Sequence, residues 1–480
     1  MLALVLAALA LALPAVAAAF DNTEPYAAKQ WYLDEDNAWS FWPSVPTLAP
    51  VRVAVIDSGI DGTHPDLIGR VVAARSFVGG SAYTDEQGHG TFVAGEIAAN
   101  PFNGIGMAGL AFNAQLMIAK VVEPDGDVSL PGEVAAIRWA ADNGARVINL
   151  SLGGVRDPFN SKLDTYSPLE QAAVDYAYSK GAVIVAAVGN GPQSPATPWN
   201  FAHYPAALPH VIGVSAIRED GSVPAYSNRD AVYNDLAAPG DDIFSTIPQH
   251  LVAAGPGCED HPYSDCGDYE FRDAIGTSFA APQVAAAAAL LIGQDPSLRP
   301  EQVAWLLERG ADDASAATGC EECPVGRDPF TGWGTLDVAA SLTMLTDGTT
   351  LPAPDRYEPN DNAGPWAHAL PPLPRTIAAS VDYWDDNIDV YRVHLNAHAR
   401  LYAHLDRAGD AVVKLALWLP GTTRVDGLST ASGRVAQSRR VGSQVRLAYR
   451  APKAGTYYLE IRLVSKTRDP VQYRLSLARG

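Results

Sequence analysis

The feature that most constrains the fold is a regular alternation of short apolar runs and helical runs between residues 51 and about 345. Strand-like runs of buried character are "RVAVID", "RVINLSLGG", "AVIVAAVGNG" and "HVIGVSAI". Between them lie runs with helical periodicity, such as "PGEVAAIRWAADNGA" and "SPLEQAAVDYAYSKG". This alternation predicts an α/β fold with a mostly parallel sheet and helices on both of its faces.

One helical run carries signals at both of its ends. Ser167 is the expected N-cap, Pro168 takes the first helical position and Glu170 the third, which together form a capping box. Gly181 is expected to close the helix.

The alanine-rich stretch "AIGTSFAAPQVAAAAALLI", residues 274–292, predicts a helix buried at the centre of the molecule. Its small side chains allow close packing, and Pro282 is expected in the first turn, where a missing N–H is harmless. Thr277 and Ser278 then lie at the helix N-terminus, where unpaired N–H groups and the positive end of the helix dipole gather. Taken alone, these two residues are ordinary caps.

Composition narrows the class of protein. The chain of 480 residues is 48% hydrophobic with 41 Gly and 36 Pro, which is typical of a globular, loop-rich protein. Its formal net charge of −20 argues against nucleic acid or an anionic membrane as a partner. We expect no nucleic-acid partner, no stable membrane association and a monomeric protein.

The N-terminus and the cysteines both indicate export. Residues 1–19 are apolar and end in small residues, which predicts a signal peptide cleaved after Ala17 or Ala19 and a secreted or extracellular protein. No Lys or Arg precedes this run, so a weak N-terminal anchor and a start further upstream are the alternatives. The four cysteines are expected to form two local disulfides, Cys258–Cys266 and Cys320–Cys323, in preference to a zinc site.

Four polar residues occupy matching positions in the predicted topology. Asp57 ends the strand "VAVID", and Asn190 follows the strand "AVIVAAV". His89 and Ser278 each lie at the start of a predicted helix. Each has an ordinary structural explanation as a turn former, a cap or a structural histidine. Because parallel sheets bind ligands beyond the carboxyl ends of their strands, the four together predict one site.

The order Asp, His, Ser on an α/β frame is the order of the catalytic residues in the subtilisins. Residues 21 to about 345 resemble the subtilisin-like serine proteases of peptidase family S8, with a thermitase-like pattern, in "VAVIDSGIDGTHPDL", "GHGTFVAG", "VINLSLGG", "AAVGNG" and "GTSFAAPQVA". The resemblance implies a serine endopeptidase of broad specificity that forms an acyl-enzyme through Asp57, His89 and Ser278, with Asn190 as an oxyanion donor. A catalytically weak or inactive binding protein of the same fold is the alternative. An α/β-hydrolase esterase requires a G-x-S-x-G motif, which the chain lacks.

The resemblance also implies how a peptide binds. Ser151, Leu152 and Gly153 match the strand that pairs with extended substrate, and Gly126 matches the opposite side of the groove. The acidic run "VVEPDGDV" either favours basic substrate residues or is a solvated loop.

Calcium is the cofactor that the resemblance implies. Glu24, Asp66 and Asn103 match the ligand positions of the family's strong site, with Ile105 and Met107 as carbonyl donors. Two departures are Glu24, where the thermitase pattern has Asp, and Pro101–Phe102 in the loop. The alternative is that Asp66 and Asn103 are turn residues.

The chain is expected to contain a signal peptide at 1–19, a peptidase domain at 20–345, a Pro-rich linker at 346–365 and a smaller all-β sandwich at 366–480. The C-terminal part resembles the bacterial pre-peptidase C-terminal domain in "DRYEPNDNA", "DDNIDVYRVHL" and "AGTYYLEI".

Overall fold

The computed structural model describes residues 20–252, 271–353, 355–383, 386–407, 409–425, 433–441, 444–467 and 469–480. The predicted signal peptide and the pair Cys258–Cys266 lie outside the described residues. None of the described helices is long and apolar enough to cross a bilayer.

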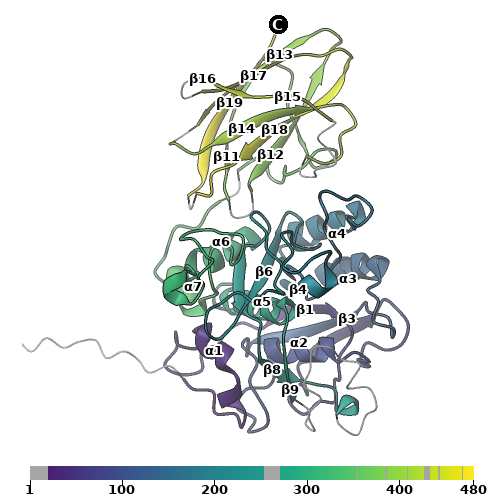
Figure 1. Cartoon of the computed structure of the whole chain (residues 1–480), viewed down its shortest axis with the longest axis vertical. Helices are drawn as coiled ribbons and strands as arrows, with labels where there is room; N and C mark the ends of the chain where they lie inside the picture. The colour runs from purple at the N-terminus through teal and green to yellow at the C-terminus, as the bar shows by residue number, and fades with distance from the viewer. Residues whose placement is uncertain are drawn as a thin grey trace, which may run out of the picture.

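The larger unit is built on a seven-stranded sheet with the order β2-β3-β1-β4-β5-β6-β7. Every neighbouring pair in this sheet runs parallel. The strands are β1 (Val51–Asp57), β2 (Val71–Ser76), β3 (Ala114–Lys120), β4 (Val147–Leu150), β5 (Val183–Ala187), β6 (Val211–Ile217) and β7 (Leu236–Pro239). The predicted parallel α/β fold is confirmed (Figure 1).

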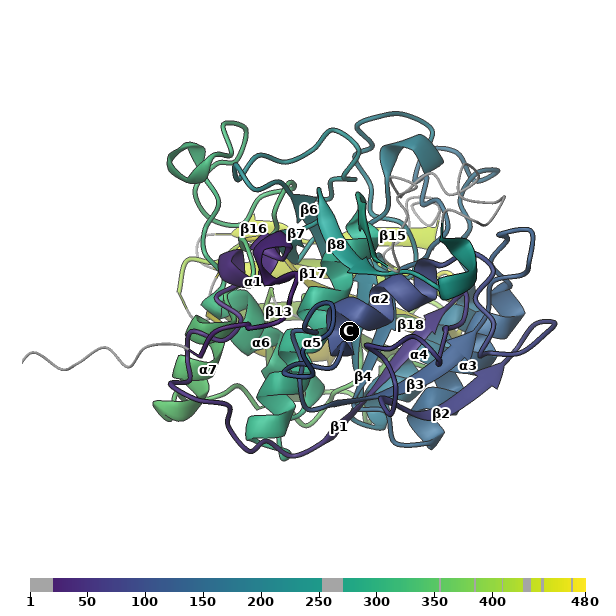
Figure 2. The ribbon, with the colours of Figure 1, turned by 90° about the horizontal axis from the view of Figure 1, so that it is seen from below.

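Helices cover both faces of the sheet. The described α-helices are α1 (Trp31–Glu35), α2 (His89–Ala98), α3 (Leu130–Asp142), α4 (Pro168–Ser179), α5 (Thr277–Gln294), α6 (Pro300–Gly310) and α7 (Val338–Thr346). Successive residues of β1 point to opposite faces, so that Val53 and Val55 pack in the core with α2 and α5, whereas Ala54 and Ile56 pack with α3 and α4. A small antiparallel pair, β8 (Ile243–Thr246) and β9 (Phe271–Ala274), lies beside α2 (Figure 2).

Helix α5 is the buried central helix that its alanines predicted. Residues 279–281 and 283–292 are at most 2% exposed, Pro282 is buried, and the helix packs against strands β4, β5 and β6 and against α2. Its start differs from the prediction in one respect. The helix begins at Thr277 with Gly276 as N-cap, so Pro282 lies in the second turn and not in the first.

The capping box predicted for α4 is present only in part. The Ser167 hydroxyl accepts a hydrogen bond from the Glu170 N–H at 3.3 Å, and Gly181 has the expected positive φ of 88°. The Glu170 side chain, however, contacts Glu133 of α3, so it does not complete the box. Burial raises the pKa of Glu170 to about 7, and burial with the charge of Glu170 raises the pKa of Glu133 well above its usual value.

The C-terminal unit consists of two five-stranded sheets, as the all-β prediction required. One has the order β10-β12-β18-β14-β15 and the other β11-β19-β13-β17-β16. Their strands are β10 (His368–Ala369), β11 (Arg375–Val381), β12 (Ile388–Leu395), β13 (Arg400–Arg407), β14 (Val413–Trp418), β15 (Arg434–Gln437), β16 (Arg439–Val441), β17 (Gln444–Arg450), β18 (Gly455–Leu463) and β19 (Val471–Arg479). The domain boundaries given above stay predictions.

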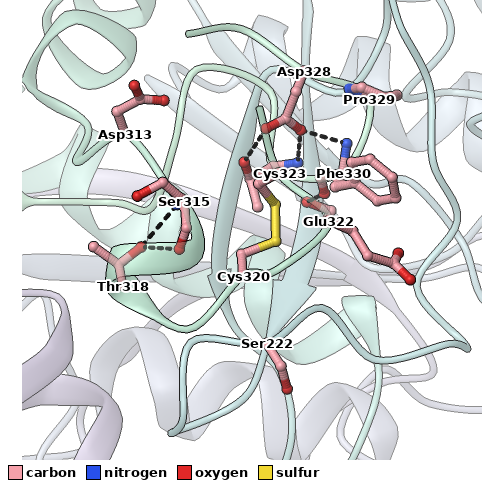
Figure 3. Close-up of a disulfide and its surroundings, with 12 residues drawn as sticks. Ser222, Asp313, Ser315, Thr318, Cys320, Glu322, Cys323, Asp328, Pro329 and Phe330 are labelled. Atoms are coloured by element: carbon pink, nitrogen blue, oxygen red, sulfur yellow. Dashed lines mark hydrogen bonds between the residues drawn. A yellow bond between two sulfur atoms is a disulfide. The ribbon is translucent and has the colours of Figure 1, made fainter. Parts of the chain in front are cut away.

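Cys320 and Cys323 form the expected disulfide, which closes a short loop beside Asp328 (Figure 3). Both cysteines are buried with Ala314 in a small apolar cluster. Asp328 accepts from the N–H groups of Phe330 and Thr331 and so orders the turn that follows.

Replacing Ala286 by leucine is expected to lower the free energy of unfolding by about 1–3 kcal/mol, because a buried helix packed through alanines has no room for the added carbons. Urea denaturation followed by circular dichroism measures the change. Ala135→Leu, at an exposed position of α3, is the matched control and should change stability by less than about 0.5 kcal/mol. Equal losses in the two variants would contradict the packing described here.

Candidate active site

The carboxylate of Asp57 and the imidazole of His89 are in direct contact. Asp57 is the last residue of β1 and His89 the first of α2. The His89 Nδ1 lies 2.8 Å from Asp57 Oδ1 and 3.0 Å from Oδ2, while Asp57 is only 2% exposed. Burial lowers the pKa of His89, but the charge of Asp57 and the hydrogen bond to it outweigh burial and raise the pKa above its usual value.

Asp85, which the sequence analysis did not single out, holds the start of α2. This fully buried carboxylate accepts hydrogen bonds from the N–H groups of Gly88 and Thr91, each at 2.8 Å, and from the hydroxyl groups of Ser58 at 2.7 Å and Thr91 at 2.6 Å. The signal was available in "DEQGHGT", since an aspartate directly before a helix commonly satisfies its first N–H groups.

Lys120 is a second residue that the sequence analysis missed. It ends β3 directly beside Asp57 in the parallel register, and it is 1% exposed. Its ammonium group donates to the Ser58 carbonyl at 2.9 Å and the Thr84 carbonyl at 2.8 Å, and it pairs with the Glu86 carboxylate. A buried lysine with three acceptors fixes the two loops that follow β1 and precede α2.

The position of Pro282 has a structural consequence at Ser278. Proline has no N–H to donate to the carbonyl four residues earlier, which here belongs to Ser278. That carbonyl instead accepts a hydrogen bond from the Ser151 hydroxyl at 2.7 Å, and Asn149 donates to the same hydroxyl at 2.9 Å. The residue after β4 is thereby tied to the first turn of α5.

Asn190 ties the same helix turn to another strand. It lies just beyond β5, and its Oδ1 accepts from the Thr277 N–H at 3.0 Å and the Thr277 hydroxyl at 3.1 Å. Neither Thr277 nor Ser278 is the N-cap, so their presence is not explained by capping.

One cleft of about 440 Å³ brings the sequence-predicted residues together. It is lined by Asp57, His89, Asn190 and Ser278, and also by the four predicted substrate contacts Ser151, Leu152, Gly153 and Gly126. Gly153 is required by close packing, because a Cβ there would lie 2.4 Å from the Tyr204 carbonyl oxygen. Sequence reasoning did not find several other lining residues, among them Gln87, Gln193 and His203.

The acidic loop contributes one residue to this cleft. Asp127 lines the cleft, whereas Glu123 and Asp125 do not. The Asp127 carboxylate therefore places a negative charge in the lining of the cleft.

The residues predicted to bind calcium form a separate cluster. Asp66 is fully buried and accepts from Asn103 Nδ2 and from the Met107 N–H, each at 2.8 Å. The Ile105 N–H donates to Asn103 Oδ1 at 2.8 Å. Glu24 is 4% exposed, and neither of its carboxylate oxygens has a hydrogen-bond partner. Burial, with the nearby charge of Glu24, raises the pKa of Asp66 to about 6.

Comparison with known proteins agrees with this fold. The subtilase family model matches residues 49–334. Subtilisin DY of Bacillus licheniformis is 38% identical over 256 residues, which cover 53% of this chain and 81% of that protein. Thermitase of Thermoactinomyces vulgaris is 33% identical over 302 residues, which cover 62% of this chain and 93% of that protein.

The thermophilic serine proteinase of Bacillus sp. (strain AK1) is 37% identical over 244 residues, which cover 51% of this chain. The match covers only 52% of that relative's length. Among solved structures, a protease from Pseudoalteromonas arctica has a TM-score of 0.54 at 25% identity, over 68% of this chain and 99% of that chain. A lanthipeptide protease has a TM-score of 0.53 at 24% identity, over 66% and 94% of the two chains, which supports the fold.

The family model and these relatives establish the class. The chain belongs to the subtilase family and is a serine-type endopeptidase. The matched region ends at residue 334, so the likeness of the C-terminal unit to the pre-peptidase C-terminal domain rests on its sequence motifs.

Replacing Asp57 by asparagine is expected to lower the pKa of His89, because the charge that raises this pKa is removed while burial, which lowers it, remains. The imidazole then becomes neutral at a lower pH than in the parent chain. NMR titration of labelled histidines measures the shift. His203, whose pKa burial lowers to about 4, is the internal control and should not move. An unchanged His89 titration would contradict the Asp57 contact.

Proposed function

We propose that the protein is a secreted endopeptidase in which Ser278 is the nucleophile, His89 the general base and Asp57 the residue that orients the base. The single observation that supports this proposal is the cleft in which all three residues and Asn190 meet. The direct contact of Asp57 with His89 Nδ1 leaves Nε2 as the ring atom that accepts a proton.

The proposed reaction has two halves. Ser278 Oγ attacks the carbonyl carbon of the scissile peptide as His89 takes its proton, and Asp57 stabilises the resulting imidazolium. The tetrahedral oxyanion receives hydrogen bonds from the Ser278 N–H, in the first turn of α5, and from the Asn190 amide. His89 then protonates the departing amine. Water, deprotonated by His89, attacks the acyl-enzyme, and the peptide acid leaves as the proton returns to Ser278.

Specificity is proposed to be broad. In this proposal Ser151, Leu152 and Gly153 offer one edge for main-chain pairing with an extended polypeptide, and Gly126 offers the opposite side. All four residues line the cleft. Pairing of this kind recognises backbone shape more than side-chain identity. Asp127 gives the groove one negative charge near its edge, which favours basic residues at that point of the substrate.

Export is supported by two features of the chain. The apolar sequence of residues 1–19 is typical of a signal peptide, and the Cys320–Cys323 disulfide suits an oxidising compartment.

Replacing Ser278 by alanine is expected to reduce turnover on casein by a factor on the order of a million, the size found for the subtilisin nucleophile. Initial rates of peptide release measure the loss, and circular dichroism confirms that the variant is folded. Ser161→Ala, at an exposed position, is the matched control and should retain full activity. Undiminished hydrolysis by folded Ser278→Ala would remove this residue from the mechanism. A parent chain that binds but does not cleave casein would favour the inactive-binding alternative.

We also propose that calcium binds near Glu24, Asp66 and Asn103, with the carbonyl groups of Ile105 and Met107 as further oxygen donors. The residues fit such an ion because Glu24 presents two buried oxygens without donors beside the buried Asp66. Hard oxygen ligands of this type suit Ca²⁺, which would supply charge compensation and join the N-terminal segment to the loop after α2.

Calcium at about a hundred times its Kd is expected to raise the thermal midpoint by about 3–5 °C relative to the same chain in EDTA. Asp66→Asn keeps the shape of the side chain but removes its charge, and it should abolish the contribution of this site. The exposed Asp125→Asn is the control. Differential scanning calorimetry of chains carrying Ser278→Ala, which prevents self-digestion, measures the effect. An equal calcium response in Asp66→Asn and in the parent would exclude this site.

A further inference from the structure

The C-terminal unit contacts the peptidase unit at several separate points. His210 Nε2, just before β6, lies 3.0 Å from Asp361 Oδ2, and Arg309 of α6 lies 3.5 Å from Asp469. Figure 1 shows the C-terminal unit above β6 and α6, as these contacts require. A third contact, made by Arg424, is different because it reaches the segments that border the active-site cleft.

Arg424 lies between β14 and β15 and contacts two tyrosine side chains of the peptidase unit. Its guanidinium carbon is 3.4 Å from the centre of the Tyr166 ring, and the guanidinium is within hydrogen-bonding range of the Tyr204 hydroxyl. The two rings meet edge to face, with centroids 5.6 Å apart. A planar guanidinium can stack on one ring while it donates to a neighbouring oxygen, so one cation joins both tyrosines.

The backbone that carries Arg424 is fixed within the C-terminal unit. The next residue, Val425, is 4% exposed and packs in a small apolar cluster of that unit. Its N–H donates to Asn362 Oδ1 at 2.8 Å, and its carbonyl accepts from Arg462 at 3.1 Å. The guanidinium is therefore presented to the peptidase unit from an anchored loop.

Tyr204 is joined through its main chain to the predicted substrate edge. Its N–H donates to the Gly154 carbonyl and its carbonyl accepts from the Gly154 N–H, each at 2.9 Å. The packing leaves no slack, because a Cβ at Gly153 would lie 2.4 Å from the Tyr204 carbonyl oxygen. The preceding residue, His203, itself lines the cleft. A displacement of Tyr204 would therefore move the lining of the cleft.

Tyr166 is joined to the same edge through its neighbour Thr165. The Thr165 N–H donates to the Val155 carbonyl at 2.9 Å, and Val155 lines the cleft. A Cβ at Gly154 would lie 2.3 Å from the Thr165 hydroxyl oxygen, so this side is also closely packed. Residues 153–155 thus lie between two segments, and Arg424 contacts a tyrosine of each.

We propose that Arg424 is a positioning residue for peptide binding. It fixes the spacing between the segments of Tyr166 and Tyr204, and so holds residues 153–155 where they can pair with an extended substrate. The inference rests on the proposed function, since it concerns the substrate edge of the same cleft. Among the described residues, those that line the cleft all belong to the peptidase unit, so the C-terminal unit acts on substrate affinity from outside it.

A simpler role for Arg424 would be to fasten the two units together. In that case its removal would lower stability and leave peptide affinity unchanged, as would the loss of any other contact between the units. Arg309 supplies the matched comparison, because Arg309→Ala removes a different contact between the units, the one with Asp469.

Binding of a fluorescein-labelled octapeptide from casein, followed by fluorescence anisotropy, tests the proposal. Every chain is full-length and carries Ser278→Ala to prevent cleavage, and circular dichroism verifies that it is folded. Arg424→Ala should weaken binding about tenfold, a usual size for coupling between separate sites. Arg424→Lys keeps a cation near the Tyr166 ring and should recover most of the affinity. Arg309→Ala should bind as tightly as its parent.

A second measurement uses the chains with Ser278 intact. Arg424→Ala should raise KM for a tetrapeptide p-nitroanilide about tenfold and leave kcat within about twofold, since the edge binds ground state and transition state alike. The N-acetyl ethyl ester of the last residue of that tetrapeptide offers almost no backbone for pairing. Its hydrolysis should be unchanged in Arg424→Ala.

Parent-like affinity in folded Arg424→Ala would overturn the proposal, and so would an equal loss in Arg309→Ala. Because the anisotropy measurement requires no cleavage, it separates this inference from the proposed function. A parent chain that binds the octapeptide and hydrolyses neither substrate would contradict the endopeptidase and leave the role of Arg424 to be decided by affinity. A parent chain that does not bind the octapeptide would overturn both.

Discussion

The hydrogen bond from the Ser151 hydroxyl to the Ser278 carbonyl is the interaction on which the geometry of the site depends. It exists because Pro282 cannot supply the N–H that would otherwise satisfy this carbonyl. With the bonds from Thr277 to Asn190, it fixes the first turn of α5 to the ends of β4 and β5. The alanines that follow let the helix lie close against the sheet, so Ser278 is placed by rigid elements on every side.

The other reacting group, the His89 imidazole, is positioned by buried charged residues. Asp57 contacts its ring directly, Asp85 holds the start of its helix, and Lys120 draws the adjoining loops together. Each of these charged groups is almost fully buried and satisfied by several partners. The Glu24 carboxylate beside Asp66 is different, because neither of its buried oxygens has a hydrogen-bond donor. The proposed calcium ion would supply the positive charge that this carboxylate lacks.

Much of the fold could be predicted from the sequence, because strand and helix periodicity is local. The strand ending at Asp57, the α4 cap at Ser167 and the convergence at one edge of the sheet follow from the pattern and from parallel topology. The place of Pro282 was wrong by one turn, since the exact start of a helix depends on tertiary partners such as Asn190. Lys120 and the contact of His210 with Asp361 join residues distant in sequence, and no local signal marks them.

The central claim is that one serine is activated by its surroundings while the chain's other serines are not. The most direct test is reaction of the folded chain with diisopropyl fluorophosphate, followed by peptide mass spectrometry to locate the modified residue. This account predicts a single phosphoryl adduct, on Ser278, whose formation slows as the pH falls and His89 becomes protonated. An adduct on a different serine, or none on the folded chain at neutral pH, would contradict it.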